Sequence, residues 1–231
     1  MTGFRLPLRL RADAVEMLDA PSLEPHDVER NLADLARLNR LPGGAGTSAH
    51  AIDRLLDGRR HARILDAGAG RGDMPLAFAR RGWEVTAFDT HPGVLGVARR
   101  VTGGEPRITV VEADARSLPF DDGAYHVAHC SLLLHHLDPG DAAKVLREMR
   151  RVSRAGVVVN DLRRGVLPFV ATAATVLALG RSHVTRNDGL LSARRAYTLD
   201  ELDELLDGAG LAVRWRSPGW MPRVVTAASP R

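Results

Sequence analysis

The sequence predicts an α/β fold in which a mostly parallel, doubly wound sheet carries helices on both faces. From His61 onward, short β-branched or apolar runs alternate with helical stretches, which is the pattern of such a sheet. A glycine-rich segment at residues 67–73 follows the first predicted strand and opens the next predicted helix. With 231 residues, the chain is long enough for one domain with appendages.

Residues 1–57 are predicted to form an N-terminal helical cap, and residues 58–231 the main domain. Val28, Leu32 and Leu35 are spaced as on one face of a helix, which is expected to end before Pro42. A second helix should follow and end near Asp57. Both parts are expected to belong to a single structural domain.

The strands and helices of the sheet are predicted to alternate up to Asn160. Right-handed crossovers place the carboxyl ends of parallel strands at one edge, where open α/β sheets bind their ligands. The functional site is therefore expected at that edge. The predicted strands are Arg63–Asp66, Glu84–Asp89, Ile108–Glu112, Ala124–Cys130 and Gly156–Asn160, and the predicted helices between them are Met74–Arg81, Val94–Arg100 and Asp141–Arg151.

The C-terminal third departs from this alternation with an insert at about residues 162–197. The insert is predicted to contain one helix, Gly165–Gly180, which is either an ordinary core helix or a cover over an apolar acceptor. We favour the cover because the helix interrupts the alternating pattern. After the insert, Thr198–Asp207 is a predicted helix with Thr198 as its N-cap, and strands are predicted at Leu211–Arg216 and Val224–Ala227.

Composition argues against nucleic acid as a partner. The formal net charge is +4, but the positive residues are nearly all arginines that lie scattered in doublets among acidic residues. A nucleic-acid face would gather them beside aromatic platforms, and aromatic residues make up only 4% of the chain. We therefore expect a small-molecule partner. The sequence does not predict the oligomeric state.

Neither a metal ion nor membrane insertion is expected from the sequence. No Cys/His cluster has the spacing of metal ligands. The single Cys130 cannot form an intramolecular disulfide, which favours the reducing cytoplasm. Residues 1–10 lack the apolar stretch of a secretory signal, and the apolar run Val166–Leu179 is too short to span a bilayer.

The glycine-rich loop is flanked by two carboxylates, and these acids discriminate between ligands. Asp66 precedes the loop glycines, and Asp73 stands where a dinucleotide-binding fingerprint has Gly or Ala. Both acids would repel a pyrophosphate at the N-terminus of the following helix. A ligand that carries positive charge and no phosphate fits this loop better. This disfavours an NAD-dependent oxidoreductase.

The motifs along residues 60–161 resemble those of the class I S-adenosylmethionine-dependent methyltransferases. The acid-x-Gly-x-Gly-x-Gly loop is complete at residues 66–72, and the stretch Leu134-His135-His136-Leu137 resembles the quinone-biosynthesis members. The resemblance implies a Rossmann-like seven-stranded sheet and S-adenosylmethionine as cofactor. One departure is His126, where the family commonly has Asp, and this weakens assignment to a subfamily.

The resemblance also implies which residues hold the cofactor. Asp89, at the end of the second strand, would accept hydrogen bonds from both ribose hydroxyls, and Asp114, after the third strand, would contact the adenine amine. The alternative for each is an ordinary turn or cap residue. The predicted cofactor-binding residues are Asp66, Ala67, Gly68, Gly70, Asp89, Thr90, Asp114, Ala115 and Cys130.

His135 and His136 are the predicted catalytic residues. They follow the fourth strand, where the transferred methyl group should lie, and a neutral imidazole there could take the proton from an attacking hydroxyl. The alternative is a structural histidine bonded to backbone, because methyl transfer to an ionised phenol needs only proximity and alignment. His135 is the first choice for proton removal.

The sequence therefore predicts methylation of a small hydrophobic acceptor, aromatic or polyketide-like, as in secondary metabolism, and at an oxygen. Carbon methylation of an aromatic or quinone ring uses the same cofactor site and is not separated by the sequence. A protein that binds the cofactor without methyl transfer is the alternative of another class. Nucleic-acid methylation is disfavoured because no Asn/Asp-Pro-Pro-aromatic motif follows the fourth strand.

Overall fold

A computed structural model describes residues 11, 12, 14, 16, 17, 24–219, 221 and 223–231. Residues 1–10, on which the prediction about a secretory signal rests, lie outside the described residues. Most of the helical prediction before Glu24 lies outside them as well. Among the described residues, no helix combines the length and the apolar character needed to cross a membrane.

The centre of the fold is a seven-stranded sheet in the order β3-β2-β1-β4-β5-β7-β6. The first five strands along the chain pair in parallel, and β7 runs antiparallel between β5 and β6. The predicted doubly wound α/β fold is thereby confirmed. The strands are β1 (Arg63–Ala67), β2 (Glu84–Asp89), β3 (Ile108–Glu112), β4 (Tyr125–Ser131), β5 (Ser153–Leu162), β6 (Leu211–Arg216) and β7 (Arg223–Pro230).

Helices cover both faces of the sheet because alternate strand residues are apolar on each side. On one face, Ile64 and Val127 pack against α2 and α3, and Ala87 packs against α4. On the other face, Leu65 and Ala128 pack against α5 and α8. These helices are α2 (Ala45–Leu56), α3 (Asp73–Ala79), α4 (Pro92–Thr102), α5 (Pro139–Val152) and α8 (Leu199–Gly208).

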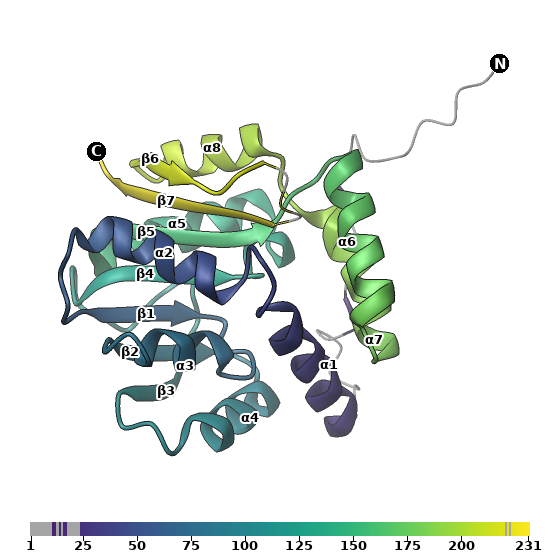
Figure 1. Ribbon diagram of the computed structural model, residues 1–231. Helices are drawn as coiled ribbons and strands as arrows, with labels where there is room; N and C mark the ends of the chain where they lie inside the picture. Colours follow the sequence, from purple (N-terminus) through teal and green to yellow (C-terminus); the bar gives the residue numbers. More distant parts are fainter. Residues whose placement is uncertain (1–10, 13, 15, 18–23, 220, 222) are drawn as a thin grey trace.

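The remaining helices stand at the carboxyl edge of the parallel strands, as Figure 1 shows. They are α1 (Pro25–Leu38), η2 (Leu134–His136), α6 (Val166–Leu179) and α7 (His183–Arg195). Helix α7 contacts α1, α6 and η2, so the N-terminal helix and the insert meet above the sheet edge. The two helices of the predicted N-terminal cap therefore lie in different places. Helix α2 belongs to the helical layer on the sheet, whereas α1 lies over the edge of the sheet.

The insert after β5 contains two helices where the sequence predicted one. Helix α6 lies within the predicted Gly165–Gly180, and α7 was not foreseen because its sequence contains Gly189 and its buried residues include Thr185, Asp188 and Ser192. Such small and polar residues give no apolar periodicity. They are buried against α1 and the N-terminal segment, because Thr185 contacts Asn31, Asp188 contacts Met17 and Ser192 contacts Glu16.

Candidate functional site

A cavity of about 480 Å³ lies at the carboxyl edge of the sheet and is called the edge cavity here. Its floor is formed by the loops after β1, β2 and β4, and its walls come from α1, α6 and α7. Aliphatic lining residues come mainly from α1 and from the loop after β4, whereas α6 and α7 contribute mostly threonine and other polar residues. The aliphatic lining residues are Leu32, Leu35, Leu38, Leu41, Val94, Leu132, Leu133, Leu162 and Val176.

The glycine loop turns towards the edge cavity through left-handed backbone conformations. Gly68 has φ of +82° and Gly70 has φ of +51°, and both line the cavity. A Cβ atom at Gly68 would meet no atom within 4 Å, so this backbone faces open space that a ligand can fill. At Gly72, by contrast, a Cβ atom would lie 2.5 Å from Cγ2 of Thr102, so this glycine lets the loop pack against α4.

Asp89 and Thr90 lie on the floor of the edge cavity, at the end of β2. One carboxylate oxygen of Asp89, Oδ1, accepts a hydrogen bond from the backbone N–H of His91 at 2.9 Å. Burial raises the pKa of Asp89, because the charged form loses hydration. A ligand that donates hydrogen bonds to this carboxylate would compensate for that loss.

Asp66 lies beneath the loop and is absent from the cavity lining. Its Oδ1 is 2.6 Å from Nδ1 of His129, whose Nε2 is 2.9 Å from Oγ of Ser48 on α2. Asn160 donates to the same hydroxyl at 2.8 Å. The strand alternation explains the placement, because Asp66 points to the same side as Ile64, into the layer under α2. The residue ties the loop to the sheet.

Four other predicted cofactor residues also lie outside the lining of the edge cavity: Ala67, Cys130, Asp114 and Ala115. Cys130 points to the face covered by α5, and burial raises the pKa of its thiol well above the ordinary value. Asp114 is paired with Arg116, whose Nη2 is 2.7 Å from Oδ2, and this guanidinium lowers the pKa of the carboxyl group. A contact from Asp114 to a ligand would require that pair to open.

Three polar residues on the floor were not among those predicted from the sequence. Asp73 accepts a hydrogen bond from Nδ2 of Asn39 at 2.7 Å, and Oδ1 of Asn39 accepts one from Arg223 at 2.5 Å. All three line the edge cavity. Burial lowers the pKa of Arg223 to about 10. From the sequence, Asp73 was expected to favour a positively charged ligand but was not among the predicted cofactor-binding residues, and the structure places it in the cavity lining.

His135 and His136 both line the edge cavity, as the loop glycines do. Asp161, at the end of β5, lies with its Oδ1 2.5 Å from Nδ1 of His135, and its Oδ2 accepts the backbone N–H of that residue at 3.2 Å. These contacts fix the imidazole with Nδ1 towards Asp161 and Nε2 towards the cavity. Burial acts to raise the pKa of Asp161, but its contacts with His135 outweigh burial and the pKa lies below the ordinary value.

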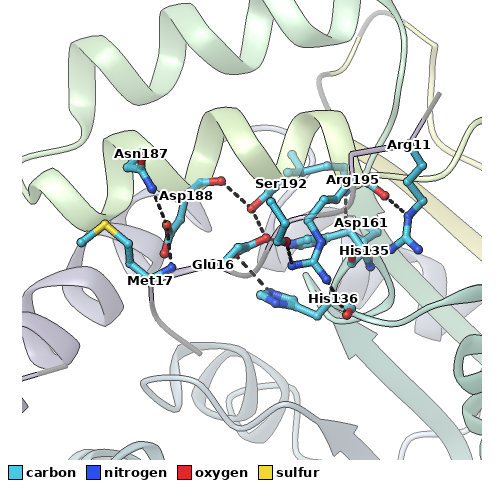
Figure 2. Close-up of polar contacts among 12 residues, drawn as sticks. Arg11, Glu16, Met17, His135, His136, Asp161, Asn187, Asp188, Ser192 and Arg195 are labelled. Atoms are coloured by element: carbon cyan, nitrogen blue, oxygen red, sulfur yellow. Dashed lines mark hydrogen bonds and ion pairs between the residues drawn. The ribbon is translucent and has the colours of Figure 1, made fainter. Parts of the chain in front are cut away.

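The described part of the N-terminal segment passes over the two histidines, as Figure 2 shows. Arg11 donates to the backbone carbonyl of His135 at 2.5 Å, and its guanidinium lies 4.5 Å from the ring centre of Tyr197. Met17 donates its backbone N–H to Asp188 on α7 at 3.0 Å. Between these two anchors, Glu16 lines the edge cavity and is 4% exposed.

Comparison with known proteins decides the family. A model of a methyltransferase domain matches residues 64–156. A demethylmenaquinone methyltransferase from Thermobifida fusca is 31% identical over 162 residues, which cover 68% of this chain and 68% of that protein. A malonyl-acyl-carrier-protein O-methyltransferase from Salmonella typhimurium is 37% identical over 128 residues, 54% of this chain and 49% of that protein. The chain belongs to the class I S-adenosylmethionine-dependent methyltransferases.

Solved structures share the methyltransferase fold. An S-adenosylmethionine-dependent methyltransferase from Aquifex aeolicus superposes with a TM-score of 0.63 at 16% identity, covering 90% of this chain and 98% of that one. At this identity the likeness shows the fold alone. Among the curated relatives, the chain spans 65% of the length of a demethylmenaquinone methyltransferase from Clavibacter sepedonicus, and about half of the Salmonella protein.

S-adenosylmethionine is the cofactor of this methyltransferase family, and the floor of the edge cavity fits it. The open space at Gly68 admits a ligand against bare backbone, and the carboxylates of Asp73 and Asp89 face a ligand that carries positive charge. Ser131, also in the lining, has a buried Oγ with no hydrogen-bond partner among the described residues. A buried hydroxyl of this kind is a free site for a polar ligand.

Proposed function

We propose that this methyltransferase transfers a methyl group from S-adenosylmethionine to an oxygen of a small hydrophobic acceptor, aromatic or polyketide-like, in secondary metabolism. The observation that carries the proposal is a cavity lined both by the glycine loop of the cofactor site and by a pair of histidines, with leucines of α1 beside them. A cavity of about 480 Å³ is of the size that small-molecule sites have.

On the cofactor side, we assign Gly68, Gly70, Asp89 and Thr90 to direct contact, because these residues line the cavity. Asp89 retains one carboxylate oxygen, Oδ2, beyond the one that His91 occupies, and Oδ1 has a second lone pair for a ribose hydroxyl. Asp66, Ala67 and Cys130 would support the loop from below. The roles of Asp114 and Ala115 at the adenine stay predictions.

On the acceptor side, His135 is the proposed base. When bound, the cofactor supplies a methyl group on a positively charged sulfur. Nε2 of His135 takes the proton of the acceptor hydroxyl, and the oxygen attacks the methyl carbon as the carbon–sulfur bond breaks. Asp161 stabilises the resulting imidazolium through the 2.5 Å contact with Nδ1. The ring of His136 lies beside that of His135, with 4.3 Å between the ring centres.

Carbon methylation is the second candidate, and the relatives support it. Demethylmenaquinone methyltransferases act on a quinone by their names, and they are among the relatives, alongside an O-methyltransferase. Both reactions place the acceptor in the same cavity against the same cofactor. The position of the new methyl group in the product separates them.

The test has two stages. Calorimetry with S-adenosylmethionine and S-adenosylhomocysteine should show binding of both, and mass spectrometry should show a methyl group added to one or more members of a phenol, polyketide and quinone panel. Cofactor binding without turnover of any acceptor would favour a binding protein. Failure to bind the cofactor, with binding of a nicotinamide dinucleotide instead, would overturn the proposal.

A further inference from the structure

We propose that Glu16, His135 and His136 form a binding site for a divalent transition-metal ion on the acceptor side of the edge cavity. The ligand atoms of these three side chains all lie within 4.8 Å of one another. Two imidazoles and one carboxylate suit Zn²⁺, Fe²⁺ or Co²⁺ better than Mg²⁺ or Ca²⁺, which prefer oxygen ligands. No metal was expected from the sequence, because Glu16 lies far from the two histidines along the chain.

The distances between the three side chains fit an ion better than they fit direct hydrogen bonds. Nε2 of His135 is 3.7 Å from Oε1 of Glu16, and Nε2 of His136 is 3.6 Å from Oε2. Both separations exceed the length of an N–H···O hydrogen bond. With metal–ligand bonds of about 2.1 Å, neighbouring ligand atoms lie about 3.0–3.4 Å apart, so small side-chain shifts complete the site.

Contacts with neighbouring side chains already orient two of the ligands. Asp161 holds Nδ1 of His135 at 2.5 Å, which leaves the lone pair of Nε2 for a metal ion. Oγ of Ser192 on α7 lies 2.8 Å from Oε1 of Glu16 and 2.7 Å from the backbone carbonyl of Asp188, so its one proton is shared between these two acceptors. Glu16 and His135 are 4% and 2% exposed. Metal sites in proteins show this pattern of a carboxylate behind a ligating histidine and a hydrogen bond behind a ligating carboxylate.

The N-terminal segment delivers Glu16 to the histidines and is fixed on both sides of it (Figure 2). Arg195 donates to the backbone carbonyl of Ala14 at 2.6 Å and to that of His136 at 2.7 Å. Met17 is held by Asp188 at 3.0 Å. The backbone on both sides of Glu16 is therefore held beside the histidines. A role of Glu16 as a mere counter-ion to an imidazolium would favour one short hydrogen bond over two separations above 3.5 Å.

Three protein ligands leave open positions on the ion, and all three side chains line the edge cavity. The role of these positions rests on the proposed function: an acceptor hydroxyl binds there, and the ion lowers its pKa. In this metal-loaded form, Nε2 of His135 is a ligand and no longer a base. The proton goes to water, and the oxygen then forms its bond to the methyl carbon as the carbon–sulfur bond breaks.

The test begins with metal binding by the full chain, produced without a histidine tag and freed of metal by chelation. Titration with Co²⁺ should give the visible absorption of a site with nitrogen and oxygen ligands, and calorimetry with Zn²⁺ should show one ion per chain. Glu16→Gln and His136→Asn should each weaken binding by at least about tenfold. Glu29→Gln is the matched control, because the side chain of Glu29 is 53% exposed and pairs with Arg100 on the surface.

Binding of S-adenosylhomocysteine to the same metal-free samples distinguishes this proposal from the proposed function. The cofactor product should bind without metal, since none of the residues assigned to the cofactor is one of the three metal ligands. Failure of wild-type protein to bind Zn²⁺ and Co²⁺, or equal binding by wild type and Glu16→Gln, would overturn the metal site and leave the methyltransferase proposal intact. Metal binding without cofactor binding would overturn the methyltransferase proposal alone.

Discussion

The two sides of the edge cavity differ in how far apart their residues lie along the chain. The cofactor side draws on residues 68–73 and 89–94, two neighbouring strand-to-helix loops. The acceptor side joins Glu16, His135 and Ser192, which come from the N-terminal segment, the turn after β4 and the insert. The first side is a local motif on the sheet, and the second is assembled from three distant parts of the chain.

The two sides of the cavity are therefore shaped by different physical constraints. Backbone conformation at the sheet edge shapes the cofactor side, where Gly68 and Gly70 require positive φ. Contacts between elements shape the acceptor side, where Asp161 on β5 orients His135 and Arg195 on α7 holds the N-terminal segment. Variants on one side should therefore leave the other side unchanged.

The largest expected effect is that of His135→Gln, which should lower the rate of methyl transfer by about 10²–10⁴-fold. The variant loses Nε2, which is the proposed base in the metal-free form and a metal ligand in the metal-loaded form. Single-turnover kinetics by mass spectrometry would measure the rate, and calorimetry should find unchanged affinity for S-adenosylhomocysteine. His183→Gln, on the exposed start of α7, is the control. Full activity of His135→Gln would assign the residue a structural role only.

Asp66→Ala should lower the free energy of unfolding by about 3–5 kcal/mol, because it removes one partner of a buried pair and leaves His129 without it. Urea denaturation would measure the loss. Asp53→Ala, whose side chain is 45% exposed, is the control and should change stability little. An unchanged stability together with a large loss of cofactor affinity would place Asp66 in direct contact with the cofactor.

Asp89→Ala should weaken the binding of S-adenosylhomocysteine by about 1–3 kcal/mol, since the ribose hydroxyls lose their acceptor. Burial raises the pKa of Asp89, so the carboxylate becomes protonated at a higher pH than an ordinary aspartate. Affinity of the wild type should therefore fall as the pH drops through that raised pKa, and the variant should lack this dependence. Calorimetry over a pH series tests both points, with Asp122→Ala, 81% exposed, as control.

The smallest expected effect is that of Gly189→Ala on the acceptor wall. A Cβ atom at this position would lie 2.8 Å from Cγ2 of Val176, so the substitution pushes α7 away from α6. Overpacking of this kind costs about 1–3 kcal/mol and should lower Tm, while raising KM for the acceptor. Val176→Ala in the same chain should restore part of both. A changed cofactor affinity would contradict the separation of the two sides.

Much of the fold was predicted from local sequence patterns. The glycine loop of the cofactor site was predicted in the same way. The alternation of β-branched runs and helices predicted strands β1 to β5, and the glycines predicted the loop that turns into the cavity. The second helix of the insert was missed because its buried residues are small or polar. The position of Asp66 beneath the loop was predictable in principle, since residues two apart on a strand share a face and Ile64 is buried.

By itself, the sequence determined the doubly wound sheet, the edge at which ligands bind and a loop suited to a phosphate-free cation, because these follow from periodicity and from backbone freedom at glycine. Only the tertiary structure decided which acids face the cavity and which side chains meet His135. Glu16 and His135 are separated by 119 positions (135 less 16), and no local pattern encodes a contact over that distance. It arises from the packing of α7 against η2 and from the hydrogen bonds that hold the N-terminal segment against α7.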